Sequence, residues 1–247
     1  MFTNHFCATS PDLPPFGDHL CEYILAGNGV FVRARRPGLE ALIPVAAADI
    51  RGLVSLKPFV KLTNGSIGSD IVGSILAWMR EAAPQELLAW VGCEGTGYSA
   101  CSPEQVTSES RCKPVNPFDL QGQNAILDIH SHGNHRPFFS TTDNADEKNG
   151  FRLYAVVGGF PTPFVSMRVG IYGHFWNFPA ADVMEIIGMN ASTENGLVDD
   201  ACFIFGTPFG PAPMFKITAG DSSGDICDEC GGHHTTDACP FWQAEEG

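Results

Sequence analysis

Hydrophobic and polar positions in the first third of the chain follow the pattern of short strands. The stretch EYILAGNGVFVRARRPGLEALIPVA (residues 22–46) has apolar, β-branched runs that are broken by Gly-Asn-Gly and Pro-Gly. This pattern predicts three short antiparallel strands joined by two tight turns. We therefore expect a small β-rich module over residues 1–66. Arg33 and Arg35 would share one face of their strand, and we expect that face to be solvated.

The pattern becomes helical after TNGSIGSD (residues 63–70). Apolar residues recur at spacings of three and four: Ile71, Ile75, Leu76 and Met79. Ser69 or Asp70 is available as the N-cap, and Pro84 follows the last periodic position. These signals predict a helix over residues 70–82.

Apolar runs that are typical of buried strands follow this helix: QELLAWVGC (85–93), NAILDIHSH (124–132), RLYAVVGGF (152–160) and PFVSMRVGIYGHFWNF (163–178). Such runs indicate strands of one sheet that is covered on both faces. We therefore predict an α/β fold, with a mixed sheet flanked by helices over residues 67–195. A C-terminal extension, residues 196–247, completes the expected domain organisation.

Charge and composition narrow the class of protein. The 247 residues include 14 Lys+Arg and 28 Asp+Glu, and the formal charge of −14 opposes nucleic acid as the main partner. No apolar run reaches the ~20 residues that span a bilayer, and the first residues lack the pattern of an export signal. Nine cysteines, an odd number, then favour free thiols or metal ligands over disulfides. We expect a cytoplasmic protein without membrane partners.

One segment, LDIHSHGNHRPFFSTTD (127–143), concentrates candidate chemistry, because three of the eight histidines fall within six residues. If its first part is a strand, then Asp128, His130 and His132 point to one side. Residues two apart lie roughly 6.5 Å apart along a strand, a span that two imidazoles close to share one Zn²⁺. Asp143 is a candidate third ligand. Chance rarely produces the joint spacing H-x-H, seven residues, S-x-x-D.

This segment resembles the motif of the JAMM (JAB/MPN) metalloproteases, which is an upstream Glu followed by H-x-H-x7-S-x-x-D. The resemblance extends over about residues 68 to 180 and implies a JAB/MPN-like, cytidine-deaminase-like fold. It also implies that His130, His132 and Asp143 bind a catalytic zinc and that Ser140 helps to hold an oxyanion. The family commonly has proline directly after H-x-H, where this chain has Gly133.

The upstream glutamate is chosen among four candidates: Glu40, Glu81, Glu86 and Glu94. Members of the family place it where a helix gives way to a strand, with a small residue three positions later. Glu86, followed by Ala89, fits both conditions. Glu86 is therefore the expected general base. Two further polar residues are left open: His135 is read as a loop imidazole more readily than as a ligand, and Asp128 either orients a ligand histidine or ends the strand in solvent.

The resemblance implies a zinc isopeptidase that cleaves at the C-terminus of a ubiquitin-like protein. The overall layout is similar to that of the JAMM-domain protein of the bacterial PRTRC cassette, which implies a ubiquitin-like partner and a ThiF-type activating enzyme. Two alternatives remain. The D-x-H-x-H letters of DIHSH also open the motif of a class of metal-dependent phosphoesterases. A non-catalytic MPN scaffold that binds protein partners is the other alternative, since a fold does not establish activity.

The C-terminal segment CDECGGHHTTDACP (227–240) contains a second set of metal-ligand residue types. Its C-x2-C-x3-H-x4-C spacing is similar to a zinc knuckle and predicts a structural zinc site: Cys227, Cys230, His234 and Cys239. His233 in place of His234, or no metal at all, are the alternatives. Residues 221–247 hold seven acidic residues and no Lys or Arg, a composition that opposes phosphate binding and favours a protein partner or a simple clamp.

Overall fold

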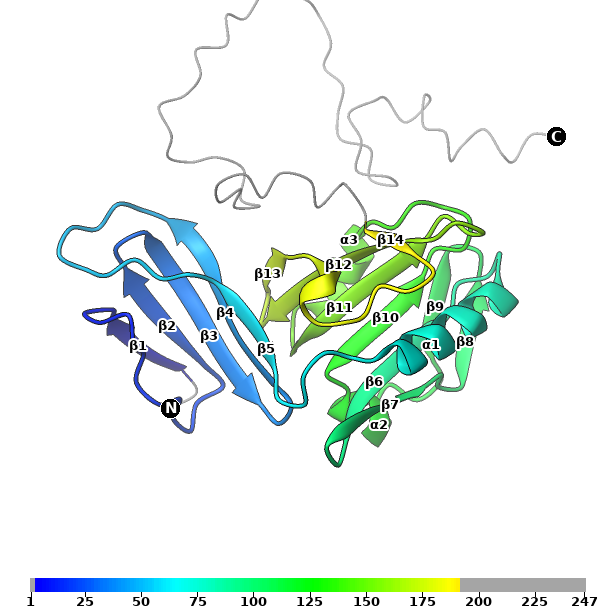
Figure 1. The fold of residues 1–247 in the computed structure, drawn as a ribbon, viewed down its shortest axis with the longest axis horizontal. Coiled ribbons are helices and arrows are strands. Elements are labelled where there is room, and N and C mark those ends of the chain that lie inside the picture. Colours follow the sequence, from blue (N-terminus) through cyan, green and yellow to red (C-terminus); the bar gives the residue numbers. More distant parts are fainter. Residues whose placement is uncertain (1–2, 192–247) are drawn as a thin grey trace, which may run out of the picture.

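The computed structural model describes residues 3–191, and Figure 1 shows two β-sheets side by side over this range. The first sheet has the order β1-β2-β3-β4-β5. Its strands are β1 (Thr3–Cys7), β2 (Cys21–Ala26), β3 (Gly29–Arg36), β4 (Leu39–Ala47) and β5 (Phe59–Leu62). The three antiparallel strands predicted over residues 22–46 are confirmed as β2, β3 and β4. Sequence periodicity missed β1, which pairs parallel to β2, and β5.

The prediction of a solvated face around Arg33 is wrong. Arg35 is exposed, but Arg33 is only 8% exposed. Its Nε and Nη2 atoms donate to Glu40 Oε1 at 2.9 and 2.5 Å, and its Nη1 donates to the carbonyl oxygen of Pro14 at 2.8 Å. The segment before β2 therefore covers this face, and the ring of Phe16 lies 5.5 Å from the Arg33 guanidinium.

The second sheet has seven strands and contains the motif found in the sequence. Its main order is β13-β12-β11-β10-β6-β7, with β14 beside β12. These strands are β6 (Leu88–Glu94), β7 (Gly97–Cys101), β10 (Leu127–Ser131), β11 (Phe151–Gly158), β12 (Phe164–Ile171), β13 (His174–Asn177) and β14 (Asn190–Ala191). The predicted strands are confirmed as members of one sheet, and the sheet is mixed, because β10 pairs parallel to β11 and antiparallel to β6.

The remaining described elements are short, apart from the first helix. They are α1 (Ser69–Ala82), α2 (Leu120–Asn124), α3 (Thr141–Glu147), the 3₁₀ helix η1 (Ala180–Asp182) and the hairpin of β8 (Gln105–Ser108) and β9 (Arg111–Pro114). The helix predicted over 70–82 is confirmed as α1. Sequence reading did not predict the β8–β9 hairpin. Within residues 3–191, no helix is long and apolar enough to cross a membrane.

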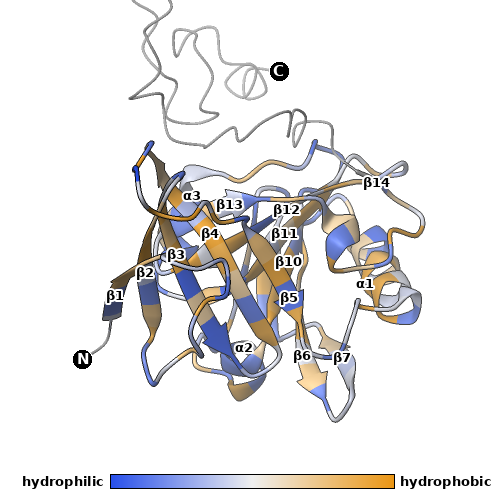
Figure 2. Ribbon diagram, turned by 60° about the vertical axis from the view of Figure 1, so that its left-hand side comes forward, coloured by the Kyte–Doolittle hydropathy of each residue, from blue (hydrophilic) through white to orange (hydrophobic). Residues whose placement is uncertain are grey.

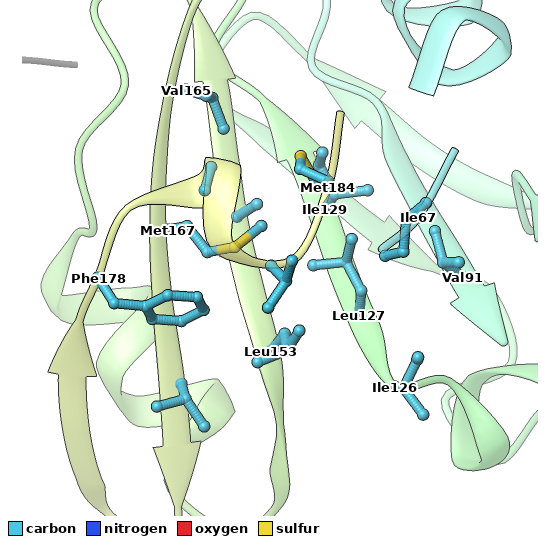
Figure 3. Close-up of a cluster of buried hydrophobic side chains, with 14 of the residues drawn as sticks. Ile67, Val91, Ile126, Leu127, Ile129, Leu153, Val165, Met167, Phe178 and Met184 are labelled. Carbon is cyan, nitrogen blue, oxygen red and sulfur yellow. The ribbon is translucent and has the colours of Figure 1, made fainter. Parts of the chain in front are cut away.

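One face of the second sheet forms the main core. Alternate residues of its central strands, among them Leu127, Ile129 and Leu153, are fully or almost fully buried there (Figure 3). The apolar stripe of α1 packs against this face, and hydrophobic and hydrophilic residues both occur on that helix in Figure 2. The first sheet adds side chains to the same cluster, for example Ile43. Each large aliphatic side chain buried in this way contributes roughly 1.5–3 kcal/mol.

The expectation of a sheet flanked by helices therefore holds only in part, because the first sheet does much of the covering that helices were expected to do. Sequence periodicity identifies which face of a strand is apolar, but it does not identify the element that packs on it. The domain boundaries at 66/67 and 195/196 stay predictions. The tail segment with the predicted zinc knuckle lies outside the described residues.

Candidate metal centre

The face of the second sheet opposite the main core carries the polar residues of the motif. In β10, Leu127 and Ile129 point into the core, so Asp128 and His130 point to the other side. His132 follows directly after the strand. The chain is held here on both sides, because the amide of His132 donates to the Val157 carbonyl at 2.7 Å and the amide of Ser131 donates to the Leu87 carbonyl at 2.9 Å.

The structure brings together His130, His132 and Asp143. One ligand atom from each lies within 4.8 Å of the others. The Nε2 atoms of the two histidines are 3.2 Å apart, and His130 Nε2 lies 3.8 Å from Asp143 Oδ1. Two nitrogens that share one tetrahedral zinc at ~2.0–2.1 Å lie about 3.3 Å apart. The spacing of the imidazoles thus fits a shared zinc ion.

The protonation states of the two histidines also suit metal binding. Burial lowers the pKa of His130 below its ordinary value, although the nearby carboxylates of Asp143 and Asp128 oppose this. Burial, together with repulsion from His130, lowers the pKa of His132 to about 4. Both rings are therefore neutral at physiological pH, the form in which imidazole binds metals.

Asp143 is presented by the first turn of α3, and Ser140 is the N-cap of that helix. The Ser140 hydroxyl donates to Asp143 Oδ2 at 2.7 Å and accepts from the Asp143 amide at 3.1 Å. The Ser140 amide also donates to Asp143 Oδ2, at 2.6 Å. This capping box leaves Oδ1 of Asp143 facing the histidines. Ser140 therefore fixes the orientation of the carboxylate, and its expected contact with an oxyanion stays a prediction.

Glu86 lies between the end of α1 and the start of β6, as expected from the sequence. It is 8% exposed, and its Oε1 lies 4.0 Å from His132 Nε2. Burial, with a further contribution from the charge of Asp143, raises the pKa of Glu86 to about 7. A carboxyl group with a pKa near neutrality can accept and return a proton under ordinary conditions.

The other candidate glutamates lie elsewhere. Glu40 is bonded to Arg33 in the first sheet, Glu81 is on α1, and Glu94 is at the end of β6 that leads into the β6–β7 turn. Among the four candidates, the structure thus brings Glu86 to the histidines.

Two open assignments stay open. Asp128 lies 3.7 Å from Arg152 Nη1, and this contact does not test whether Asp128 orients a ligand histidine. The amide of His135 donates to the carbonyl of His132 at 2.9 Å, which places His135 in the turn that follows the ligands.

Gly133, at the position where the JAMM family commonly has proline, has φ +51°. Proline is held near φ −65° and cannot adopt this conformation. The Gly133 carbonyl accepts from the amides of Gly159 and Phe160 at 3.1 and 3.2 Å. The departure from the motif is therefore matched by a left-handed turn that is tied to the end of β11.

Sequence reading missed two residues beside the site. Cys112, on β9, lies with its thiol beside the Glu86 carboxylate, where it opposes the rise in the pKa of Glu86. The hairpin that carries it is tied to the same residue, because the Glu86 amide donates to the Ser108 carbonyl at 2.8 Å. Arg168, on β12, contacts the helix that presents Asp143. Neither residue belongs to a local motif, so no signal in the sequence pointed to them.

A mixed sheet that has two buried histidines and a partly exposed aspartate at the carboxyl end of its central strand β10 defines a candidate metal-binding domain. Residues 68–170 match the family described as prokaryotic homologs of the JAB domain. The matched segment begins at the N-cap of α1 and ends in β12, so it includes the whole His-His-Asp group and Glu86.

Other comparisons add little. No curated protein matches the chain. The solution structure of protein DSY2949 from Desulfitobacterium hafniense is similar over 51% of this chain and 93% of that chain, with 12% identity and a TM-score of 0.32. A likeness of this size supports no conclusion about function.

Proposed function

We propose that this protein is a zinc-dependent peptidase or isopeptidase of the JAMM type. The observation that carries the proposal is the convergence of His130, His132 and Asp143, with the buried carboxyl group of Glu86 beside them. A metal-binding scaffold would need only the three ligands. A buried carboxyl group adjacent to the metal site, placed to take up and release a proton, is what hydrolysis additionally requires.

Each residue has a defined task in this proposal. Zinc, when bound, would lower the pKa of a coordinated water toward ~7 and polarise the substrate carbonyl. His130, His132 and Asp143 would hold it. Glu86 takes the proton from the attacking water and later gives it to the departing amine as the C–N bond breaks. The Ser140 hydroxyl donates to Asp143 Oδ2 in the resting site. In the transition state its single proton would turn to the developing oxyanion, while the Ser140 amide keeps its own bond to Asp143 Oδ2.

The substrate proposed is a ubiquitin-like protein, or its conjugate, cleaved at its C-terminus. The support is the resemblance of the motif to the JAMM isopeptidases and the match of residues 68–170 to the JAB domain. The similarity of layout to the JAMM-domain protein of the PRTRC cassette further suggests a ThiF-type activating enzyme in the same system, in the cytoplasm. The phosphoesterase alternative is less well supported, because it leaves Glu86 and the S-x-x-D spacing without a role.

Glu86→Gln tests this function most directly. Glutamine keeps the size of the side chain but cannot accept the proton, so the rate should fall by ~10² or more while the zinc content stays unchanged. The assay follows, by mass, the cleavage of a ubiquitin-like protein that carries a C-terminal extension. Glu94→Gln is the matched control, because Glu94 is an exposed glutamate at the far end of β6.

The possible outcomes separate the alternatives. If wild type, assayed with zinc, cleaves no such extension and yet binds one zinc through His130 and His132, the scaffold function is favoured. Release of phosphate from generic phosphoesters would favour the phosphoesterase. Equal rates for wild type and Glu86→Gln would show that Glu86 is not the base.

A further inference from the structure

The helix that presents Asp143 has little packing of its own to hold it. Helix α3 has seven residues, and none of them is buried. Isolated helices shorter than ~12–15 residues are marginal in water, and most helices in proteins are held by an apolar face. The capping box orders the first turn of α3 but does not attach the helix to the sheet. Other contacts must fix the distance from Asp143 to the histidines.

Arg168 makes the strongest of these contacts. It lies on β12, on the same face of the sheet as the site, and is only 4% exposed. Its Nε and Nη2 donate to Glu147 Oε2 at 2.9 and 2.5 Å, and its Nη1 donates to Asn144 Oδ1 at 2.6 Å. A single guanidinium therefore binds α3 at two positions, one next to Asp143 and one at the last residue of the helix.

The guanidinium is itself held in place by two aromatic rings. Its carbon lies 3.9 Å from the centroid of Phe139 and 4.1 Å from the centroid of Phe175. Phe139 directly precedes the N-cap Ser140, so this stacking also fixes the entry into α3. Arginine suits such a place because its planar fork stacks on rings and donates in several directions at once.

The other contacts of α3 are weaker anchors. The Tyr154 hydroxyl donates to the Glu147 carbonyl at 3.1 Å, and Lys113 lies 3.0 Å from Asp146 on the surface. An exposed ion pair of this kind contributes little. Burial raises the pKa of Glu147. The positive charge of Arg168 opposes that rise and so favours the ionised carboxylate that accepts the bond.

We propose that Arg168 is a positioning residue that sets the metal affinity of the site by fixing α3, and with it Asp143, against the two histidines. The inference rests on the metal site of the proposed function. Partners that orient the ligands of a metal site typically change its affinity by ~10- to 100-fold when they are removed.

The test compares Arg168→Met with Arg33→Met in the full-length protein. Methionine keeps a long apolar stem but removes the charge and every donor. Arg33 is the matched control, because it is also buried, bonded to a glutamate and stacked near an aromatic ring, but in the first sheet. Three measurements are made on each variant: zinc affinity by chelator competition, the electronic spectrum of the Co²⁺ form, and hydrogen exchange of α3 without metal.

Arg168→Met should bind zinc ~10- to 100-fold more weakly than wild type and should change the Co²⁺ spectrum. Hydrogen exchange of α3 should be faster than in wild type, while exchange of β10 should be unchanged. Arg33→Met should leave all three unchanged even if it unfolds at a lower temperature. Arg168→Lys should fall between wild type and Arg168→Met, because a single ammonium cannot reproduce the fork. Asn144→Ala, an exposed change that removes one contact, should weaken binding in the same direction even if Arg168→Met does not fold.

Zinc affinity of Arg168→Met within twofold of that of Arg33→Met, with an unchanged Co²⁺ spectrum, would overturn the inference. If wild type itself bound no metal, the proposed function would fail. In that case, exchange of α3 at the wild-type rate in Arg168→Met would also refute the role of Arg168 in holding the helix, and exchange faster than in wild type would support it.

Discussion

Replacing Gly133 with alanine should destabilise the turn that follows the two ligand histidines. Gly133 has φ +51°, and a Cβ atom there would lie 2.5 Å from the carbonyl oxygen of Pro84. A non-glycine residue in the left-handed region costs roughly 1–2 kcal/mol, of which the lower entropy of the unfolded chain returns about 0.4–1 kcal/mol. The close approach adds a steric term of about 1–3 kcal/mol, because a backbone carbonyl cannot swing aside as a side chain can.

Gly95→Ala separates the two terms. Gly95 has φ +59°, and nothing lies within 4 Å of the position that its Cβ would occupy. Gly95→Ala should therefore lose only the conformational part, and Gly133→Ala should lose about 1–3 kcal/mol more of the free energy of unfolding. Denaturant unfolding of both variants measures this difference, provided that the free energy of unfolding of each variant has the same dependence on denaturant concentration. Equal stability of the two variants would refute the steric cost that we assign to the close approach of Gly133 to the Pro84 carbonyl.

Three further changes have expected outcomes. Zinc analysis of the purified protein should find about two ions per chain, one of them in the predicted tail site, and His130→Ala should remove about one; full zinc content in that variant would contradict the site. Met79→Ala, a fully buried position on α1, should lower the free energy of unfolding by ~2–5 kcal/mol, whereas the exposed Glu81→Ala should change it by less than ~0.5 kcal/mol. Burial lowers the pKa of His174, so its contribution to stability is present above the unfolded pKa of about 6.5 and is lost as the pH falls below it. His174→Gln, which keeps a hydrogen-bonding group near the Tyr23 hydroxyl, should thus make stability less sensitive to acid in melting curves at several pH values, and an unchanged sensitivity would rule out this assignment.

Local patterns in the sequence predicted a large part of the fold. The apolar period of residues 71–79 located α1, and the strand-like runs located β6, β10, β11 and β12, because periodicity and breakers act over a few neighbouring residues. The spacing of His130 and His132 likewise located both imidazoles on one side of one segment. These features depend only on residues that are neighbours within one helix or strand, so they can be predicted from the sequence alone.

Only the tertiary structure decided which side chains from separate helices and strands contact one another. Arg33 is buried because residues near Pro14 fold over its strand. The motif pointed to Glu86, but its distance from His132 is set by the pairing of β6 with β10. The contact of Arg168 with α3 depends on the pairing of β12 with β11, and Cys112 reaches Glu86 through a hairpin that periodicity did not reveal. Each of these contacts joins residues from separate elements, and their distance is set by strand pairing and packing over the whole core, which the order of residues in one segment does not specify.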